Sequence, residues 1–205
     1  MKLTPSELFT NISDGVFVFS GFISLLIGFS FGLLFNKLLT DQVEWVEFLL
    51  IQILFGKLPT IAVLGFLALR SSMLLQWTHL TTKQYQFVFN LKTNFILIFV
   101  WAGILAWALF NFFALFGFCI ALEIANQGNS LEHIKSLLID FDWTVSKRGL
   151  ERLFFESVLM AILILFENKT TFLKFNDPAK GLVRSFLLLF SVLLILEFLD
   201  IYFLI

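Results

Sequence analysis

Two long apolar runs without a charged residue constrain this chain more than any other feature. They cover residues 16–34 and 95–122, and the second run contains a single amide side chain, Asn111. The apolar core of a bilayer is about 30 Å thick, and about 20 apolar residues in a helix are needed to cross it. Because lipid offers no hydrogen-bond partners, the backbone amides must bond one another within the protein. These runs therefore predict transmembrane helices and an all-α integral membrane helical bundle.

The composition supports a membrane protein over a soluble one. Of the 205 residues, 59% are hydrophobic and only 14% are charged, and the mean hydropathy is +0.93. A soluble domain usually has about a quarter charged residues. The chain is too apolar for intrinsic disorder. A net charge of −1 without a basic block gives no support for nucleic-acid binding, so we expect no nucleic-acid partner.

The second apolar region, residues 46–75, has two interpretations. Gly56, Lys57 and Pro59 interrupt it near its middle. In the first interpretation, one helix crosses the membrane from residue 46 onward and is kinked at Pro59, whose ring clashes with the preceding turn. In the second, which we favour, the crossing helix covers residues 58–75, and Pro59 lies in its first turn. Lys57 then lies among the lipid headgroups, at lower energetic cost.

The last third of the chain predicts up to two further spans. Residues 150–166 form a short apolar run and residues 182–205 a longer one, so we expect four or five transmembrane helices in a single domain. Before them, residues 130–139 place apolar and polar side chains on opposite faces at helical spacing. This pattern predicts a short amphipathic helix at the membrane surface.

The distribution of positive charges predicts an orientation. Lysine and arginine are enriched in the cytoplasmic loops of membrane proteins. With five spans, the side that holds Lys2 and Arg70 carries slightly more of them than the side that holds Lys57 and Arg152. We therefore expect the N-terminus on the cytoplasmic or matrix side.

Small residues recur at helical spacing in two of the predicted spans. In lipid, helices associate where small residues let their backbones approach closely. These residues form one stripe on each of the two spans, and each stripe could pack against the other stripe or against a second protein. The predicted helix-packing face consists of Gly21, Ser24, Gly28, Gly32, Gly103, Ala106, Ala114 and Gly117.

Ionisable residues within or next to the spans are candidate functional residues. Burying such a charge in a membrane costs at least about 2.5–3.5 kcal/mol on insertion scales, so it is rarely kept without a role. Five residues meet this condition: Lys57, Arg70, Glu156, Glu197 and Asp200.

Each of these charges also has a structural interpretation. Lys57 marks either a helix start or a helix break that exposes backbone to a ligand, as in transporters. Arg70 either extends to the interface or pairs with Glu197, Asp200 or a partner's carboxylate. Glu156 is expected to pair with the arginine one turn earlier. Glu197 and Asp200 are either hydrated at the membrane face or part of a cation or proton relay.

The residues that would carry catalysis or bind a metal form no recognisable pattern. The two histidines, His79 and His133, lie in separate loops, and zinc or haem sites need several ligands together. The single cysteine, Cys119, has no second cysteine nearby, and no nucleophile or phosphate-binding motif is present. We therefore expect no enzymatic activity, no metal and no cofactor, but we do expect bound lipids.

These features favour a non-catalytic scaffold or accessory subunit of a larger membrane complex, in transport or energy transduction. The loops are too short for a soluble domain, the small-residue faces exceed what one bundle needs, and Arg70, Glu197 and Asp200 have no assured partner within the chain. One alternative is a self-contained or homo-oligomeric channel or transporter for ions or small solutes. A second is a membrane-bound interaction or immunity factor recognised through loop residues 126–147.

Overall fold

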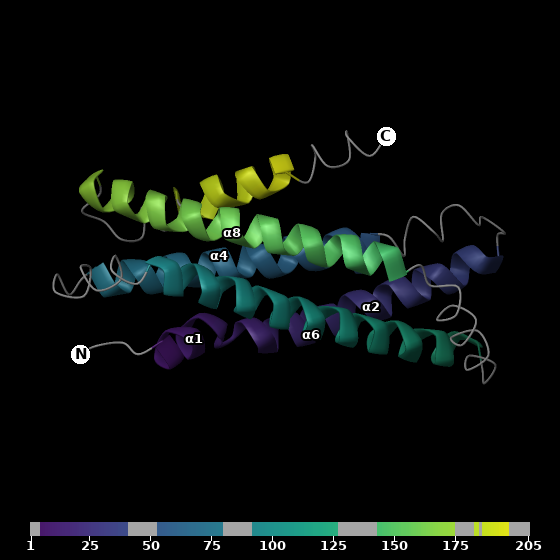
Figure 1. Ribbon diagram of the computed structural model, residues 1–205. Helices are drawn as coiled ribbons and strands as arrows, with labels where there is room; N and C mark the ends of the chain where they lie inside the picture. The colour runs from purple at the N-terminus through teal and green to yellow at the C-terminus, as the bar shows by residue number, and fades with distance from the viewer. Residues whose placement is uncertain are drawn as a thin grey trace. The chain divides into compact units, whose positions relative to one another are not determined.

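The chain is helical throughout the part that the structure describes. The computed structural model describes residues 5–40, 53–79, 92–126, 143–174, 183–184 and 186–196 (Figure 1). Apart from a turn at Asp14 and Gly15, these residues are helical, and no strand occurs among them. The predicted all-α membrane bundle is confirmed.

The described helices follow one another along the chain. In order, they are α1 (Pro5–Ser13), α2 (Val16–Thr40), the π-helical turn η1 (Ile53–Lys57), α4 (Leu58–His79), α6 (Lys92–Asn126) and α8 (Trp143–Lys174). A short apolar helix, Phe186–Leu196, comes last. Among the described residues, three segments are long and apolar enough to cross a membrane: Phe9–Lys37, Ile53–Leu74 and Phe95–Ala125.

The remaining predicted segments have different outcomes. Helix α8 contains residues 150–166 but is not among the three long apolar segments, and its first turns carry several charges. The helix Phe186–Leu196 lies within the predicted last span. The expected surface helix at residues 130–139 lies outside the described residues.

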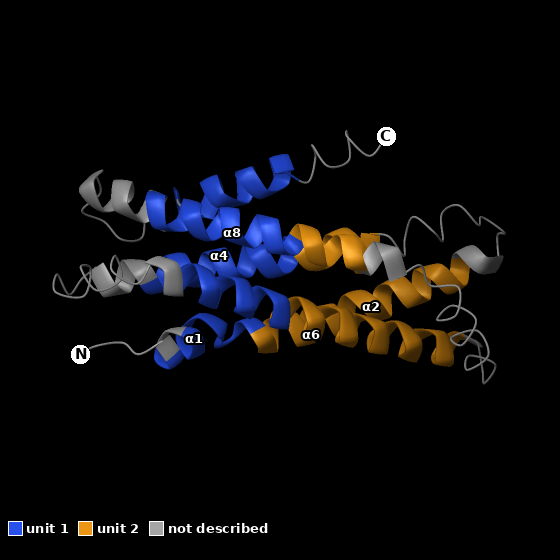
Figure 2. Ribbon diagram, viewed as in Figure 1, with its two compact units in different colours: residues 1–16, 61–105, 153–205 blue, residues 17–60, 106–152 orange. Residues whose placement is uncertain are grey.

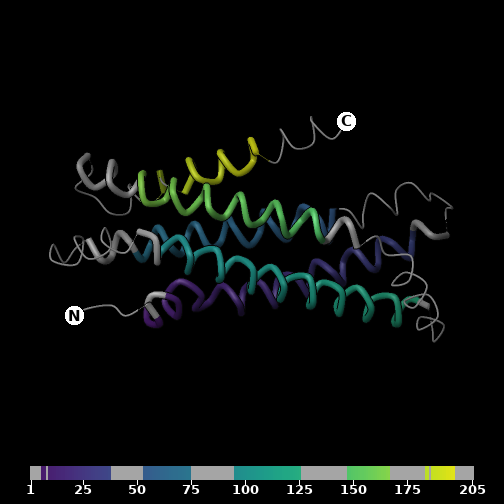
Figure 3. The backbone as a smooth tube through the Cα atoms, in the orientation of Figure 1, coloured from purple at the N-terminus to yellow at the C-terminus, as the bar shows by residue number. Residues whose placement is uncertain are grey.

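Helix α6 is the longest helix in the described part of the chain. It is one uninterrupted helix of 35 residues (Figure 3), which corresponds to about 50 Å at 1.5 Å per residue. A bilayer core is about 30 Å thick, so a helix of this length tilts or protrudes.

The chain divides into two compact units (Figure 2). Unit 1 comprises Met1–Val16, Ile61–Leu105 and Leu153–Ile205, and unit 2 comprises Phe17–Thr60 and Ala106–Arg152. Helices α4, α6 and α8 contribute residues to both units, and each unit has its own buried apolar side chains. Those of unit 1 include Ile12, Leu64, Leu67, Phe95, Phe99, Leu153, Met160 and Ile164. Those of unit 2 include Phe35, Leu54, Ala106, Phe110, Ala114, Ala121 and Leu122.

A glycine separates α1 from α2. Gly15 has a φ of 77°, a left-handed conformation that is costly for a residue with a Cβ. Just before it, the amide of Asp14 donates a hydrogen bond to the carbonyl of Thr10 over 2.7 Å. This arrangement ends α1, and the chain continues as α2 from Val16.

A widened helical turn leads into α4. η1 is a π-helical turn, a form found mostly as single turns. Pro59, the second residue of α4, has no amide hydrogen and cannot donate the usual bond to the preceding turn. The hydroxyl of Thr60 donates to the carbonyl of Gly56 over 3.5 Å. The α-helix thus begins at Leu58, and a helical turn rather than a loop comes before it.

Candidate functional site

Within unit 2, α2 and α6 touch through their backbones. Gly28 faces Ala114 so closely that a Cβ added at Gly28 would overlap the carbonyl oxygen of Ala114. In the same way, a Cβ added at Gly117 would overlap the carbonyl oxygen of Leu25. Such backbone contact is how helices associate in lipid, where no water is available to drive apolar side chains together.

The contact continues one turn further along α2. A Cβ added at Gly32 would lie 2.6 Å from the Cβ of Ala121 and 2.7 Å from the carbonyl oxygen of Phe118. The ring of Phe118 meets that of Phe35 edge to face, with centroids 5.3 Å apart. We refer to this contact as the α2–α6 seam, and its small residues are Gly28, Gly32, Ala114, Gly117 and Ala121.

The start of the predicted face on α2 is packed less tightly. A Cβ added at Gly21 would lie 3.3 Å from the ring of Phe113, which is tight but contacts a side chain instead of backbone. Ser24 is buried, and its hydroxyl donates to the carbonyl of Gly21 over 3.0 Å. These residues line α2 toward α6 without requiring glycine.

The predicted stripe on α6 is divided between the two units. Ala106 is fully buried and belongs to unit 2. Gly103 belongs to unit 1, where a Cβ would lie 3.6 Å from Leu67 of α4 and 3.9 Å from Ser157 of α8. Gly103 therefore packs against α4 and α8, although the sequence groups it with the residues that face α2.

In unit 1, Arg70 of α4 contacts the end of α1. Its Nε donates a hydrogen bond to the carbonyl of Asn11 over 3.2 Å, and its Nη2 lies 3.7 Å from Oδ2 of Asp14. The two side chains are 37% and 74% exposed, and an exposed ion pair of this kind contributes about 0.2–1 kcal/mol. Arg70 therefore connects α4 to the turn between α1 and α2.

Asp14 is not among the partners expected for Arg70 from the sequence. The sequence does indicate that the two residues lie at the same level, because Asp14 precedes the first predicted span and Arg70 follows most of the second. Two antiparallel spans bring such residues to the same membrane face. The expected partners Glu197 and Asp200 lie outside the described residues.

Two buried hydroxyls follow Arg70 on α4. Ser71 and Ser72 are fully buried, and neither hydroxyl has a hydrogen-bond partner among the described residues. Ser157 of α8, by contrast, donates to the carbonyl of Phe154 over 2.9 Å. Burial without a partner costs about 1–3 kcal/mol per polar group. The two hydroxyls are therefore an energetically unfavourable polar pair in the interior of unit 1.

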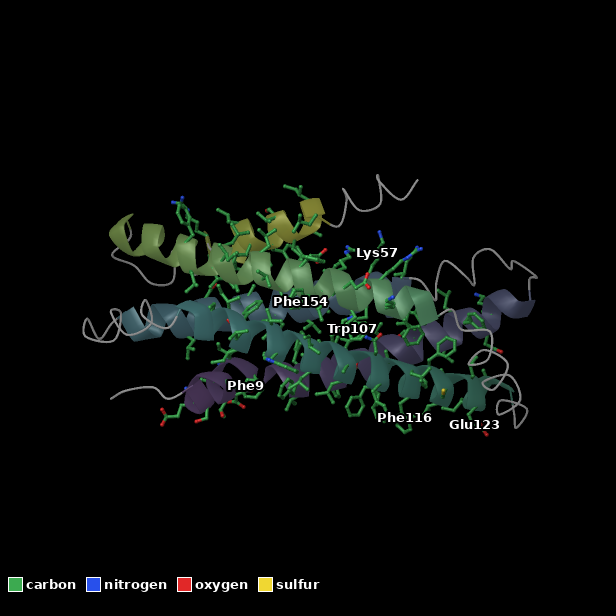
Figure 4. All side chains as sticks on the ribbon, in the orientation of Figure 1. Phe9, Lys57, Trp107, Phe116, Glu123 and Phe154 are labelled. Atoms are coloured by element: carbon green, nitrogen blue, oxygen red, sulfur yellow. The ribbon has the colours of Figure 1, made fainter. Side chains whose placement is uncertain are left out.

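In unit 2, Lys57 lies half-buried beside the first turns of α8 (Figure 4). The neighbouring Gly56 contacts Gly149 of α8, where a Cβ would lie 3.5 Å from the carbonyl oxygen of Gly56 and 3.5 Å from Cζ2 of Trp107. η1, α6 and α8 therefore meet at Gly56, Trp107 and Gly149. We refer to this position as the Gly56–Gly149 contact.

Two polar side chains of α6 lie one turn apart in unit 2. The amide of Asn111 donates to the carbonyl of Trp107 over 2.9 Å. The indole N–H of Trp107 and the side-chain oxygen of Asn111 are shielded from solvent and have no hydrogen-bond partner among the described residues. The single amide side chain in the apolar run of α6 thus donates its hydrogen bond within its own helix.

Two charged pairs on α8 follow helical spacing. Glu156 is 8% exposed, and Arg152, one turn earlier on the same face, is half-buried. Lys147 and Glu151 are 4.0 Å apart and mostly exposed. These four charges lie in the first half of α8, and Glu167, Lys169 and Lys174 follow its apolar stretch.

The described residues contain no group of three His, Cys, Asp or Glu side chains that could hold a metal ion.

No protein family, curated protein or solved structure matches this chain. The geometry itself offers a tight helix pair in unit 2, an arginine bonded to α1 in unit 1, and a group of charges where η1 meets α8.

Proposed function

We propose that this protein is a non-catalytic membrane subunit, a helical scaffold in a larger complex that works in transport or energy conversion. The observation that carries the proposal is the exposed apolar surface of the close-packed α2–α6 pair. Because glycines let the two backbones touch, α2 and α6 form a close-packed pair. Some large side chains of the pair are buried, such as Phe35 and Phe110, and many others are exposed. A scaffold needs this combination of a fixed interior and a broad apolar exterior.

The outward surface of that pair is apolar and partly aromatic. Phe22 of α2 is 65% exposed and Phe112 of α6 is 64% exposed, and Phe116 also points outward (Figure 4). Further exposed side chains on α2 are Val18, Leu26 and Leu33. Lipid tails and the apolar helices of other proteins both fit such a surface, and large exposed apolar patches mark interaction sites.

Several polar side chains of the helices form hydrogen bonds within the chain, which supports a scaffold. The hydroxyl of Ser30 bonds the carbonyl of Leu26 in its own helix, and Asn111 and Ser157 bond their own helices in the same way. Arg70 is occupied by α1. Arg70 and the small residues make their contacts within the chain, so neither requires a partner subunit. The proposal therefore depends on the outward apolar surface.

Photo-crosslinking in the native membrane tests the proposal. A benzophenone amino acid replaces Phe22 or Phe116, and the matched control carries it at Phe110, a buried phenylalanine of α6. We expect discrete protein adducts from at least one outward position and none from Phe110. Lipid adducts alone from both outward positions, together with monomeric elution in mild detergent, would contradict a scaffold role.

A pathway for ions or small solutes is the second candidate function. The observation that favours it is the pair of buried hydroxyls, Ser71 and Ser72, next to the half-exposed Arg70. Replacing Arg70 by leucine separates the candidates. A pathway loses flux in proteoliposomes while its assembly persists, whereas a scaffold shows no flux before or after the change.

A further inference from the structure

We draw no further inference here: the strongest candidate, the pair of fully buried hydroxyls of Ser71 and Ser72 on α4 in unit 1, belongs to the pathway already considered, and nothing in the described part of the chain shows what these shielded side chains would bind.

Discussion

Two glycines of the crossing helices differ sharply in what surrounds them. Gly28 faces backbone across the seam, whereas a Cβ at Gly65 would lie 3.9 Å from the ring of Phe190, an ordinary contact. Alanine is favoured over glycine in a helix by about 1 kcal/mol, so Gly65→Ala is expected to raise the free energy of unfolding by up to that amount. Gly28→Ala is expected to lower it by about 1–3 kcal/mol, because overpacking outweighs the helix propensity. Denaturant unfolding in micelles, followed by circular dichroism, measures both.

The bonds of Arg70 predict a graded loss of order in α1. Asp14→Asn removes only an exposed ion pair and should lower stability by less than about 1 kcal/mol. Arg70→Leu also removes the donor to the carbonyl of Asn11, so the amides of α1 should exchange with solvent several times faster. Hydrogen-exchange mass spectrometry compares the two variants, and equal exchange of α1 in Arg70→Leu and the native protein would show that the contact has no role.

At the scale of elements, α8 is predicted to cross the membrane. It has 32 residues, about 48 Å at 1.5 Å per residue, and its charges before Leu153 precede a mostly apolar stretch. In a background with Cys119→Ser, single cysteines at Lys147 and Lys174 are expected to react with a membrane-impermeant maleimide from opposite sides of sealed vesicles. Labelling of both from one side would instead place α8 along the membrane surface.

The seam shows what could and could not be predicted at this scale. Glycine spacing on α2 and α6 indicates two packing faces, and the structure brings Gly28 and Gly117 into one contact. The spacing does not show that Gly103 packs on α4 and α8, because a long helix contacts different neighbours along its length. The Arg70–Asp14 pair was likewise not predictable from local pattern, since it joins residues that are far apart in the sequence.

At the scale of the whole molecule, membrane integration is the property that the sequence predicts best. Long apolar runs are unfavourable in water and can cross a membrane as helices, whatever the details of packing. The three long apolar helices of the structure agree with this prediction. The protein is expected to remain in the membrane pellet after alkaline carbonate extraction and to enter solution only with detergent. Release by carbonate, measured by immunoblot of pellet and supernatant, would contradict an integral membrane fold.

Function is predicted less well from the same sequence, for a physical reason. Hydropathy is a sum over many residues, so single substitutions hardly change it. A binding site depends on a few groups whose positions follow from tertiary contacts such as that of Gly56 with Gly149. Lys57 is recognisable in the sequence as an unusual charge, but its position beside the first turns of α8 is visible only in the structure.

The α2–α6 seam has a consequence for how the protein is made. The ribosome completes α2 first, and α4 enters the membrane before α6 exists. Until α6 emerges, we expect the face of α2 at Gly28 and Gly32 to be open to acyl chains or to a second nascent copy. A chain stalled before Lys92 is expected to keep that face uncovered, so unfinished molecules would differ from finished ones at this surface.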